Sequence, residues 1–272
     1  MKNIFKYILP AFCILASSCS LDETSYTEIG KNTYMNTAAE AETVLQGIYA
    51  KMSNEYMYSY HLSLLFTISS DIAQCEGSAT SSFREIPTNT HTSTTSQISR
   101  TWQQLYAAIY SANEFIENMN ARISGWTGLN RQQGEVYIAE ARALRALFYF
   151  ELVRWYGNVP LITSTAQSSW GAGQYEQADP VDVYKFIESD LLAASQTLPW
   201  AMDDQIRANT AYRMSRGAAL GLLAKVYCTW AGYPVQDTTK WADAAKVARQ
   251  VVESGKHSLI PDYETVWYNT CN

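Results

Sequence analysis

The stretch from residue 130 to residue 160 constrains the fold more than any other part of the chain. It carries two apolar stripes at helical spacing: Val136, Ala139, Ala143, Leu147 and Phe150 form one, and Tyr137, Ala141, Leu144, Phe148, Leu152 and Trp155 form the other. Between them runs only a narrow charged edge of Glu140, Arg142, Arg145, Glu151 and Arg154. Because a helix on the surface needs only one stripe, neighbours must cover this helix on at least two sides. We therefore expect a buried helix at the centre of an all-α packing.

The ends of this helix can also be read from the residue types. Asn130 is a good N-cap, and Gln133 follows at the spacing of a capping box, so we expect the helix to begin at Asn130. Gly157 suits the left-handed position that closes a helix, and Pro160 prevents the helix from resuming.

Similar periodicities and caps predict further helices along the chain. Thr37, Asp179 and Ser215 are the expected N-caps of three of them. The helical stretches are 37–52, 62–72 (ending near Asp71), 101–122, 180–198, the run 216–234, and 241–254. Leu161–Thr163 is a short strand candidate, and the helices recur in pairs without a clean sequence repeat. These features predict a stack of antiparallel helix pairs.

Residues 74–100 differ in character from the rest of the chain. Ser, Thr, Asn and Gly dominate, Pro87 lies in the middle, and helical periodicity is lost. A loop of this length in a compact domain is usually functional or disordered. The composition leaves both a ligand-facing loop and a merely mobile loop open.

The first residues have the pattern of an export signal. Lys2 and Lys6 precede an apolar run from Tyr7 to Ala16. This run is too short to span a bilayer, which takes about 20 residues. The sequence Leu15-Ala-Ser-Ser-Cys19 resembles a bacterial lipoprotein box, so we expect a signal peptide at 1–18, lipidation of Cys19 and a tether over 19–36. The alternative is an ordinary secretory signal with an incidental cysteine. Lipidation predicts a protein anchored to a membrane, and the segment Ser20–Glu23 resembles the short acidic tag that sends such lipoproteins to the cell surface.

The remaining composition excludes several classes of function. The formal net charge of −6 argues against a nucleic-acid partner. Cys75, Cys228 and Cys271 are widely spaced and odd in number, which supports neither a disulfide framework nor a zinc site, and Cys228 is expected in the core. His61, His91 and His257 are scattered, and Asp203-Asp204 is expected to be solvated. We therefore predict no catalysis, no metal site and no cofactor.

Two motifs resemble one known family. The run AEARALRALFYFELVRWYGNVPL (139–161) and the spacing W-x3-Y-x2-I-x3-N (Trp102, Tyr106, Ile109 and Asn113) resemble the SusD/RagB family. Asn113 by itself is interpreted as a satisfied buried amide. The resemblance covers nearly the whole mature chain and implies tetratricopeptide-like helix pairs over 37–272. Family members usually continue well beyond this length, so we expect 37–272 to be an N-terminal half.

The resemblance also implies a function. Members of the family are outer-membrane lipoproteins that capture nutrients, mostly glycans, for a TonB-dependent transporter of the SusC type. The alternatives are a RagB-like protein that captures peptides or acts purely as an assembly partner, and, from another class, an exported hydrolase. In the family, the ligand face lies on loops that leave the helices.

The candidate glycan-binding residues are aromatic or hydrogen-bonding side chains near the predicted loops. They are Asp71, Phe83, Arg84, Trp102, Trp170 and Tyr175. Aromatic rings can stack on sugars, and Asp and Arg can bond hydroxyl groups. Asp71 could instead cap a helix end, and a core position is favoured for Trp102. Trp170 and Tyr175 are expected to be exposed, facing either the glycan or the transporter.

Overall fold

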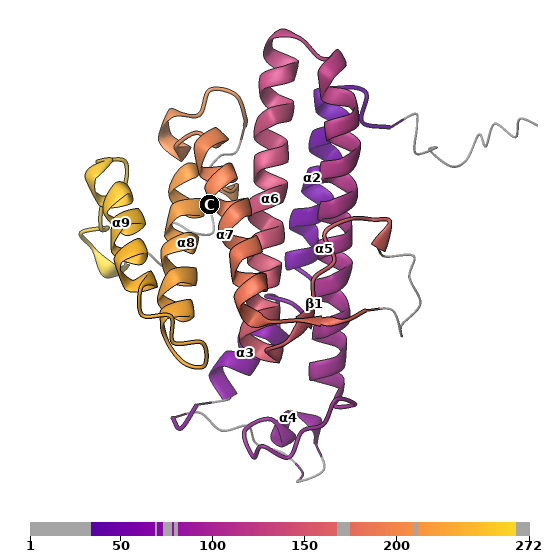
Figure 1. Ribbon diagram of the computed structural model, residues 1–272, viewed down its shortest axis with the longest axis vertical. Coiled ribbons are helices and arrows are strands. Elements are labelled where there is room, and N and C mark those ends of the chain that lie inside the picture. Colours follow the sequence, from indigo (N-terminus) through magenta and orange to yellow (C-terminus); the bar gives the residue numbers. More distant parts are fainter. Residues whose placement is uncertain are drawn as a thin grey trace, which may run out of the picture. The chain divides into compact units, whose positions relative to one another are not determined.

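The computed structural model of the chain describes residues 34–68, 70–72, 78, 81–167, 175–208 and 212–264. This part is all-α apart from one very short hairpin, as the periodicity predicted (Figure 1). The predicted signal peptide, Cys19 and nearly all of the tether lie outside the described residues. Within the described ranges, no helix has both the length and the apolar character needed to cross a membrane.

The elements follow one another along the chain with mostly short connections. The α-helices are α2 (Ala38–Met52), α3 (His61–Ile68), α4 (Ser82–Glu85), α5 (Ser96–Arg122), α6 (Gly128–Tyr156), α7 (Pro180–Thr197), α8 (Arg216–Ala231) and α9 (Lys240–Glu253). Within the described ranges, short 3-10 helices are η1 (Ile123–Gly125) and η4 (Ala201–Asp203). Strand β1 (Val159–Pro160) pairs antiparallel with β2 (Gln177–Ala178).

Consecutive helices pack against one another. Helix α6 contacts α5 on one side and α7 on the other, and α2 lies against both α5 and α6. The stack continues from α7 to α8 and from α8 to α9 (Figure 1). This arrangement confirms the predicted stack of helix pairs, with α6 as its buried centre.

Local capping chemistry sets several helix ends as predicted. The side chains of three N-cap residues accept hydrogen bonds from backbone N–H groups of the first turn: Thr37 from Glu40 (3.2 Å), Asp179 from Val181 (2.8 Å) and Ser215 from Ala218 (3.2 Å). Gly157 closes α6 with a φ of +69°, which confirms its predicted left-handed conformation.

Other predicted boundaries were wrong. Helix α6 begins at Gly128, so Asn130 lies inside the first turn and does not cap the helix. Gly128 has a φ of +57° and lets the chain turn directly from η1 into α6. Helix α3 ends at Ile68, before Asp71. The strand expected at Leu161–Thr163 lies two residues earlier, because the backbone of 159–160 pairs with β2.

The polar region 74–100 contains more regular structure than its composition predicted. It holds the single turn α4, and α5 begins within it at Ser96. The first turn of α5 is packed against its neighbours, because Gln97 is only 2% exposed. This packing favours a helix although the Ser/Thr-rich composition of the run does not.

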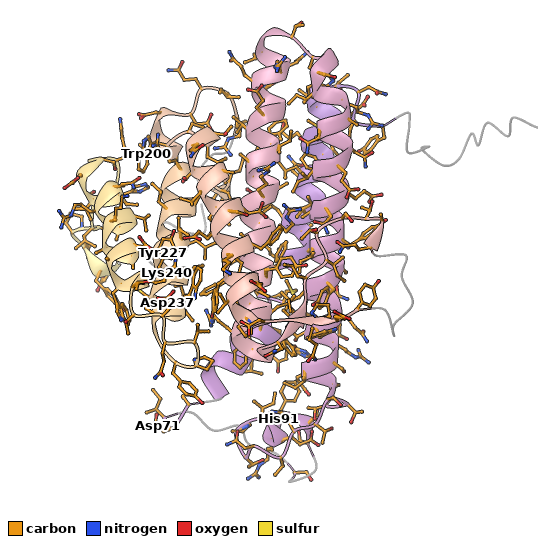
Figure 2. All side chains as sticks on the ribbon, viewed as in Figure 1. Asp71, His91, Trp200, Tyr227, Asp237 and Lys240 are labelled. Atoms are coloured by element: carbon orange, nitrogen blue, oxygen red, sulfur yellow. The ribbon has the colours of Figure 1, made fainter. Side chains whose placement is uncertain are left out.

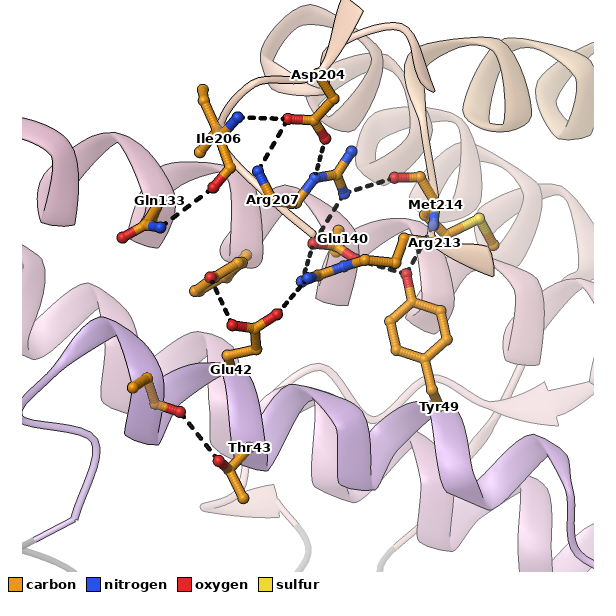
Figure 3. Close-up of polar contacts among 12 residues, drawn as sticks. Glu42, Thr43, Tyr49, Gln133, Glu140, Asp204, Ile206, Arg207, Arg213 and Met214 are labelled. Atoms are coloured by element: carbon orange, nitrogen blue, oxygen red, sulfur yellow. Dashed lines mark hydrogen bonds and ion pairs between the residues drawn. The ribbon is translucent and has the colours of Figure 1, made fainter. Parts of the chain in front are cut away.

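The narrow charged edge of α6 is largely buried, because Glu140, Arg145 and Glu151 are at most 7% exposed. Glu140 is fully buried, and two arginines from the segment before α8 pair with it (Figure 3): Arg207 at 2.9 Å and Arg213 at 2.8 Å. The Tyr49 hydroxyl of α2 donates to the same carboxylate at 2.6 Å. Asp204 pairs with Arg207 and its side chain is fully buried, so the expectation of a solvated Asp203-Asp204 pair was wrong for Asp204.

Two more charges of α6 are buried, and each has a partner from another part of the chain. Arg145 makes two hydrogen bonds, of 2.8 and 2.9 Å, to the carboxylate of Asp190 in α7. Glu151 accepts a hydrogen bond from Tyr58 at 3.2 Å and lies 3.8 Å from Arg154. Such charges are tolerated in the interior only when they are paired, so each one ties α6 to a particular neighbour.

Cys228 is exposed, so its expected place in the core was wrong. The buried side of α8 carries Ala219, Leu223, Val226 and Trp230, and Cys228 lies outside it.

The buried ion pair between α6 and α7 gives a direct stability prediction. Asp190→Ala leaves the Arg145 guanidinium buried without its carboxylate, and the free energy of unfolding should fall by about 3–5 kcal/mol. The matched control is Glu135→Ala. It removes an exposed ion pair between Glu135 and Arg131, which both lie in α6, and should lower the free energy of unfolding by about 0.5 kcal/mol or less. Urea unfolding measures both, and equal losses in the two variants would contradict this assignment.

Glu151 predicts a pH dependence of stability. Burial raises its pKa above the ordinary value of 4.5, and Arg154 and Tyr58 offset this only in part. Since the folded chain then holds this proton more tightly than the unfolded chain, the free energy of unfolding that Glu151 contributes falls as the pH rises through and above 4.5. Glu151→Gln should therefore gain stability relative to the unmodified chain between about pH 4 and pH 7. Urea unfolding across that range should show a growing gap, and a gap that shrinks with pH would contradict the sign.

Candidate functional site

An open pocket with a volume of about 610 Å³ lies between one face of α5 and the β1–β2 hairpin. Its walls are mainly aromatic or apolar: Trp102, Tyr106 and Tyr110 come from α5, Pro160 and Ile162 from β1 and the residues after it, and Tyr175 from the segment before β2. A volume of this size is typical of small-ligand sites. We call it the α5 pocket.

Helical spacing brings the three α5 rings together. Positions 102, 106 and 110 are each four residues apart, so their side chains lie on the same face. The ring of Trp102 lies 4.9 Å from that of Tyr106, tilted by 51°, and 4.9 Å from the ring of Tyr156 in α6, nearly edge-on at 77°. The Tyr156 ring thus packs against the indole of Trp102. Trp102 is half-buried and remains accessible from the pocket.

Hydrogen bonds from the core fix the opposite wall. The Tyr106 hydroxyl donates to the Pro160 carbonyl at 2.8 Å. Three hydrogen bonds hold Ile162. Tyr149 donates to its carbonyl and accepts from its N–H, both at 2.8 Å, and the Asn113 amide donates to the same carbonyl at 2.9 Å. These bonds position the chain after β1 at a fixed distance from α5.

Asn113 links this wall to the buried ion pair. Its side-chain oxygen accepts a hydrogen bond of 2.7 Å from Arg145, which also binds Asp190. Asn113 is therefore a satisfied buried amide, as its position in the sequence predicted. The pocket wall at Ile162 is continuous with the α5–α6–α7 core.

Burial keeps the two wall tyrosines protonated. It raises the pKa of Tyr106, to which the neighbouring Tyr149 adds, and it raises the pKa of Tyr149 against the opposing effect of the Ile162 hydrogen bond. Both hydroxyls therefore remain hydrogen-bond donors to the hairpin throughout the neutral range.

The rim of the pocket supplies neutral hydrogen-bonding groups. Gln103 and Gln177 are exposed, and Tyr110 is 37% exposed. Their side chains form no hydrogen bond to the described part of the chain, so they are available to a ligand. None of the described lining residues is charged. This chemistry suits a neutral ligand that has both apolar faces and hydroxyl groups.

The structure brings together two of the six candidate residues. Trp102 and Tyr175 line opposite sides of the α5 pocket. Trp102 was favoured as a core residue, but it is only half-buried and forms part of the wall. The Tyr175 hydroxyl donates to the Gln167 carbonyl at 2.9 Å, which sets its direction.

The other candidates lie elsewhere. Asp71 is exposed in the turn after α3, and Arg84 lies half-buried in α4 (Figure 2 labels Asp71). Phe83 packs edge-on against Tyr60 and His61, with ring centres 5.9 and 5.7 Å apart. None of these three lines the α5 pocket. Trp170 falls outside the described residues, and its role stays a prediction.

Sequence reasoning missed several lining residues. Tyr110, Gln103 and Gln177 were not among the candidates. An aromatic residue at every fourth position, from Trp102 to Tyr110, was the signal that could have identified the α5 wall. No comparable signal exists for Gln177, because only the pairing of β2 with β1 brings it to the pocket. Among the described residues, no three His, Cys, Asp or Glu side chains gather as a metal site would require.

Comparisons with known proteins agree on one family. Residues 21–228 match a SusD-like family model described as "Starch-binding associating with outer membrane". A SusD homolog of Bacteroides thetaiotaomicron has a solved structure that is 53% identical, with a TM-score of 0.86 over 90% of this chain and 46% of that chain. A solved structure described as "Laminarin binding SusD-like protein" is 30% identical, with a TM-score of 0.62 over 78% of this chain and 43% of that chain.

The amino-acid sequence of a curated relative also indicates the SusD-like family. SusD-like protein P2 of Formosa agariphila is 27% identical over 79% of this chain and 41% of its own length. The chain thus spans less than half the length of each of these relatives. Because the family model matches well over half of the chain, the chain belongs to the SusD-like family, as its two sequence motifs indicated.

Proposed function

We propose that this protein binds a glycan in the α5 pocket and does not act on it chemically. The observation that carries the proposal is the pocket itself, in which aromatic rings on α5 face the β1–β2 hairpin and neutral amide and hydroxyl groups form the rim. The similarity to a protein described as laminarin-binding supports a glycan as the ligand.

The physical basis is the two-sided character of a sugar ring. Its C–H face is apolar and stacks on an aromatic side chain, while its hydroxyl groups need donors and acceptors around the edge. Trp102 and Tyr110 supply the flat faces, and Gln103 and Gln177 supply amide groups that both donate and accept. A pocket lined by neutral groups also avoids the desolvation cost of a buried charge.

In the proposed cellular role, the protein is anchored in the outer membrane through lipidated Cys19 and faces the exterior. It captures oligosaccharide or polysaccharide and delivers it to a SusC-type TonB-dependent transporter. The lipoprotein box before Cys19 and the family description, which names association with the outer membrane, support this role. Asp71, Phe83 and Arg84 stay predicted contacts for the glycan, and Trp170 stays a predicted contact for the glycan or the transporter.

Affinity electrophoresis tests the function directly. The chain from Ser20 onward is run through gels that contain laminarin, starch or another polysaccharide, and each incubation is analysed for cleavage products. The proposal predicts retardation by at least one polysaccharide without new reducing ends. Retention of peptides in place of glycans would favour the peptide-capturing alternative, and new reducing ends would show a hydrolase.

The pocket predicts which side chains matter for that retardation. Trp102→Ala and Tyr110→Ala each remove a stacking face, so each should weaken glycan binding by about tenfold. Calorimetric titration with the retained glycan measures the change.

Matched controls come from aromatic residues outside the pocket. Trp241 is 50% exposed and Tyr263 is 73% exposed, so Trp241→Ala and Tyr263→Ala remove similar rings. Both controls should bind like the unmodified chain. An equal loss in the control variants, or no loss in the pocket variants, would place the glycan elsewhere.

A further inference from the structure

A smaller pocket, with a volume of about 260 Å³, lies between α6 and α7, which pack side by side (Figure 1). Its described lining consists of Glu135, Ile138, Ala139 and Arg142 of α6 and Ala193 and Thr197 of α7. None of these residues lines the α5 pocket. We call it the Arg142 pocket, because Arg142 is the cationic side chain in this lining.

Arg142 differs from the next arginine of α6 in its pairing. Arg145 binds the carboxylate of Asp190 and the side-chain oxygen of Asn113. Arg142 forms no hydrogen bond or ion pair with the described part of the chain, and its Nε is buried without an acceptor. A buried donor without an acceptor costs free energy, so buried guanidinium groups are normally paired. The Nε of Arg142 therefore indicates an acceptor that binds from outside the described residues.

A carboxylate is the acceptor that suits this pocket. The planar guanidinium group can make two parallel hydrogen bonds to a carboxylate. The carboxylate already in the lining, that of Glu135, is engaged by Arg131 at 3.0 Å, which offsets its charge. Thr197 is exposed and its hydroxyl forms no hydrogen bond to the described residues, so it offers a further donor beside the guanidinium group.

The size and the walls of the pocket favour a single inserted side chain. Pockets that enclose a small-molecule ligand usually have volumes of about 300–1,000 Å³, and this pocket is smaller. Ile138, Ala139 and Ala193 make its walls apolar. A glutamate side chain matches both features, because its methylene groups can pack on the apolar walls while its carboxylate reaches the guanidinium group. Protein interfaces are often anchored by single side chains that fill such pockets.

We infer that the Arg142 pocket anchors a partner protein, which inserts one glutamate side chain between α6 and α7 and binds Arg142 through its carboxylate. The chain has a formal net charge of −6, so a strongly acidic partner surface would be repelled. The partner therefore presents this glutamate on a neutral or basic surface. The inference goes beyond the proposed function and does not depend on glycan binding.

Heteronuclear NMR of the Arg142 Nε–H group tests the pocket directly. The chain from Ser20 onward is titrated with N-acetyl-glutamate N-methylamide, and the resonance is assigned by its absence in Arg142→Lys. The matched control is N-acetyl-glutamine N-methylamide, which has nearly the same shape without the charge. The glutamate probe should shift the resonance saturably and bind at least about tenfold more tightly than the glutamine probe.

Three outcomes of the titration would overturn the inference. Equal affinity for the glutamate and glutamine probes would show that the pocket does not recognise a carboxylate. An equal response to sodium chloride would show a general effect of anions. Tighter binding of glucuronate, a sugar that carries a carboxylate, would assign the pocket to acidic sugars in place of a protein side chain.

Arg142→Met separates binding from a structural role. Methionine keeps an unbranched apolar stem and removes the unpaired donor, so binding of the glutamate probe should be lost while the urea midpoint stays the same or rises. The control Arg249→Met removes an exposed arginine of α9 and should leave probe binding unchanged. A fall in the midpoint as large as that of Asp190→Ala would show that Arg142 already has a partner within the folded chain, which would overturn the inference.

The same variant distinguishes this inference from the proposed function. Arg142 does not line the α5 pocket, so Arg142→Met should be retarded by polysaccharide to the same extent as the unmodified chain. If the glutamate probe binds and no glycan does, the glycan function falls and the Arg142 pocket stands. If glycan binds and the glutamate probe does not, the Arg142 inference falls alone.

Discussion

The need to pair every charge that α6 carries into the interior organises this structure. Neighbours cover the helix on nearly every side, so Glu140, Arg145 and Glu151 cannot reach bulk water. Each finds partners on a different element: the segment before α8 and α2 for Glu140, α7 for Arg145, and the turn after α2 for Glu151. Hydrophobic burial favours the packing of α6, but it is not directional. Paired charges fix which neighbour lies where, because removing one partner leaves the other buried and uncompensated.

The candidate site depends on the same core. Arg145 binds Asp190 and Asn113 together, and Asn113 in turn holds the carbonyl of Ile162 in the pocket wall. Tyr149 binds the same residue from α6. The pocket wall is thus an extension of the interior network, although the pocket opens at the surface. A wall fixed in this way presents its apolar and aromatic groups to a ligand without first having to be ordered, which lowers the entropic cost of binding.

Local signals in the sequence predicted much of the fold. The N-caps Thr37, Asp179 and Ser215 and the closing Gly157 act within one turn of the chain, and all four were identified correctly. Features set by distant segments were missed: Glu140 of α6 is buried because the segment before α8 folds over it, and Cys228 lies on the exposed side of α8. In the candidate site, too, local features were predicted and long-range features were missed. Trp102 and Tyr175 were named as candidates, but the hairpin that brings Gln177 to the pocket depends on a pairing of strands that no local pattern encodes.

The buried, charge-paired helix α6 supports an aromatic pocket in which we propose that a glycan binds. A crystal structure of the chain with a bound oligosaccharide tests this connection most directly. We predict electron density for a sugar ring in the α5 pocket, stacked on Trp102 or Tyr110 and hydrogen-bonded to Gln103 or Gln177, with the Ile162 wall unmoved. A sugar bound at another surface while the α5 pocket remains empty would contradict it.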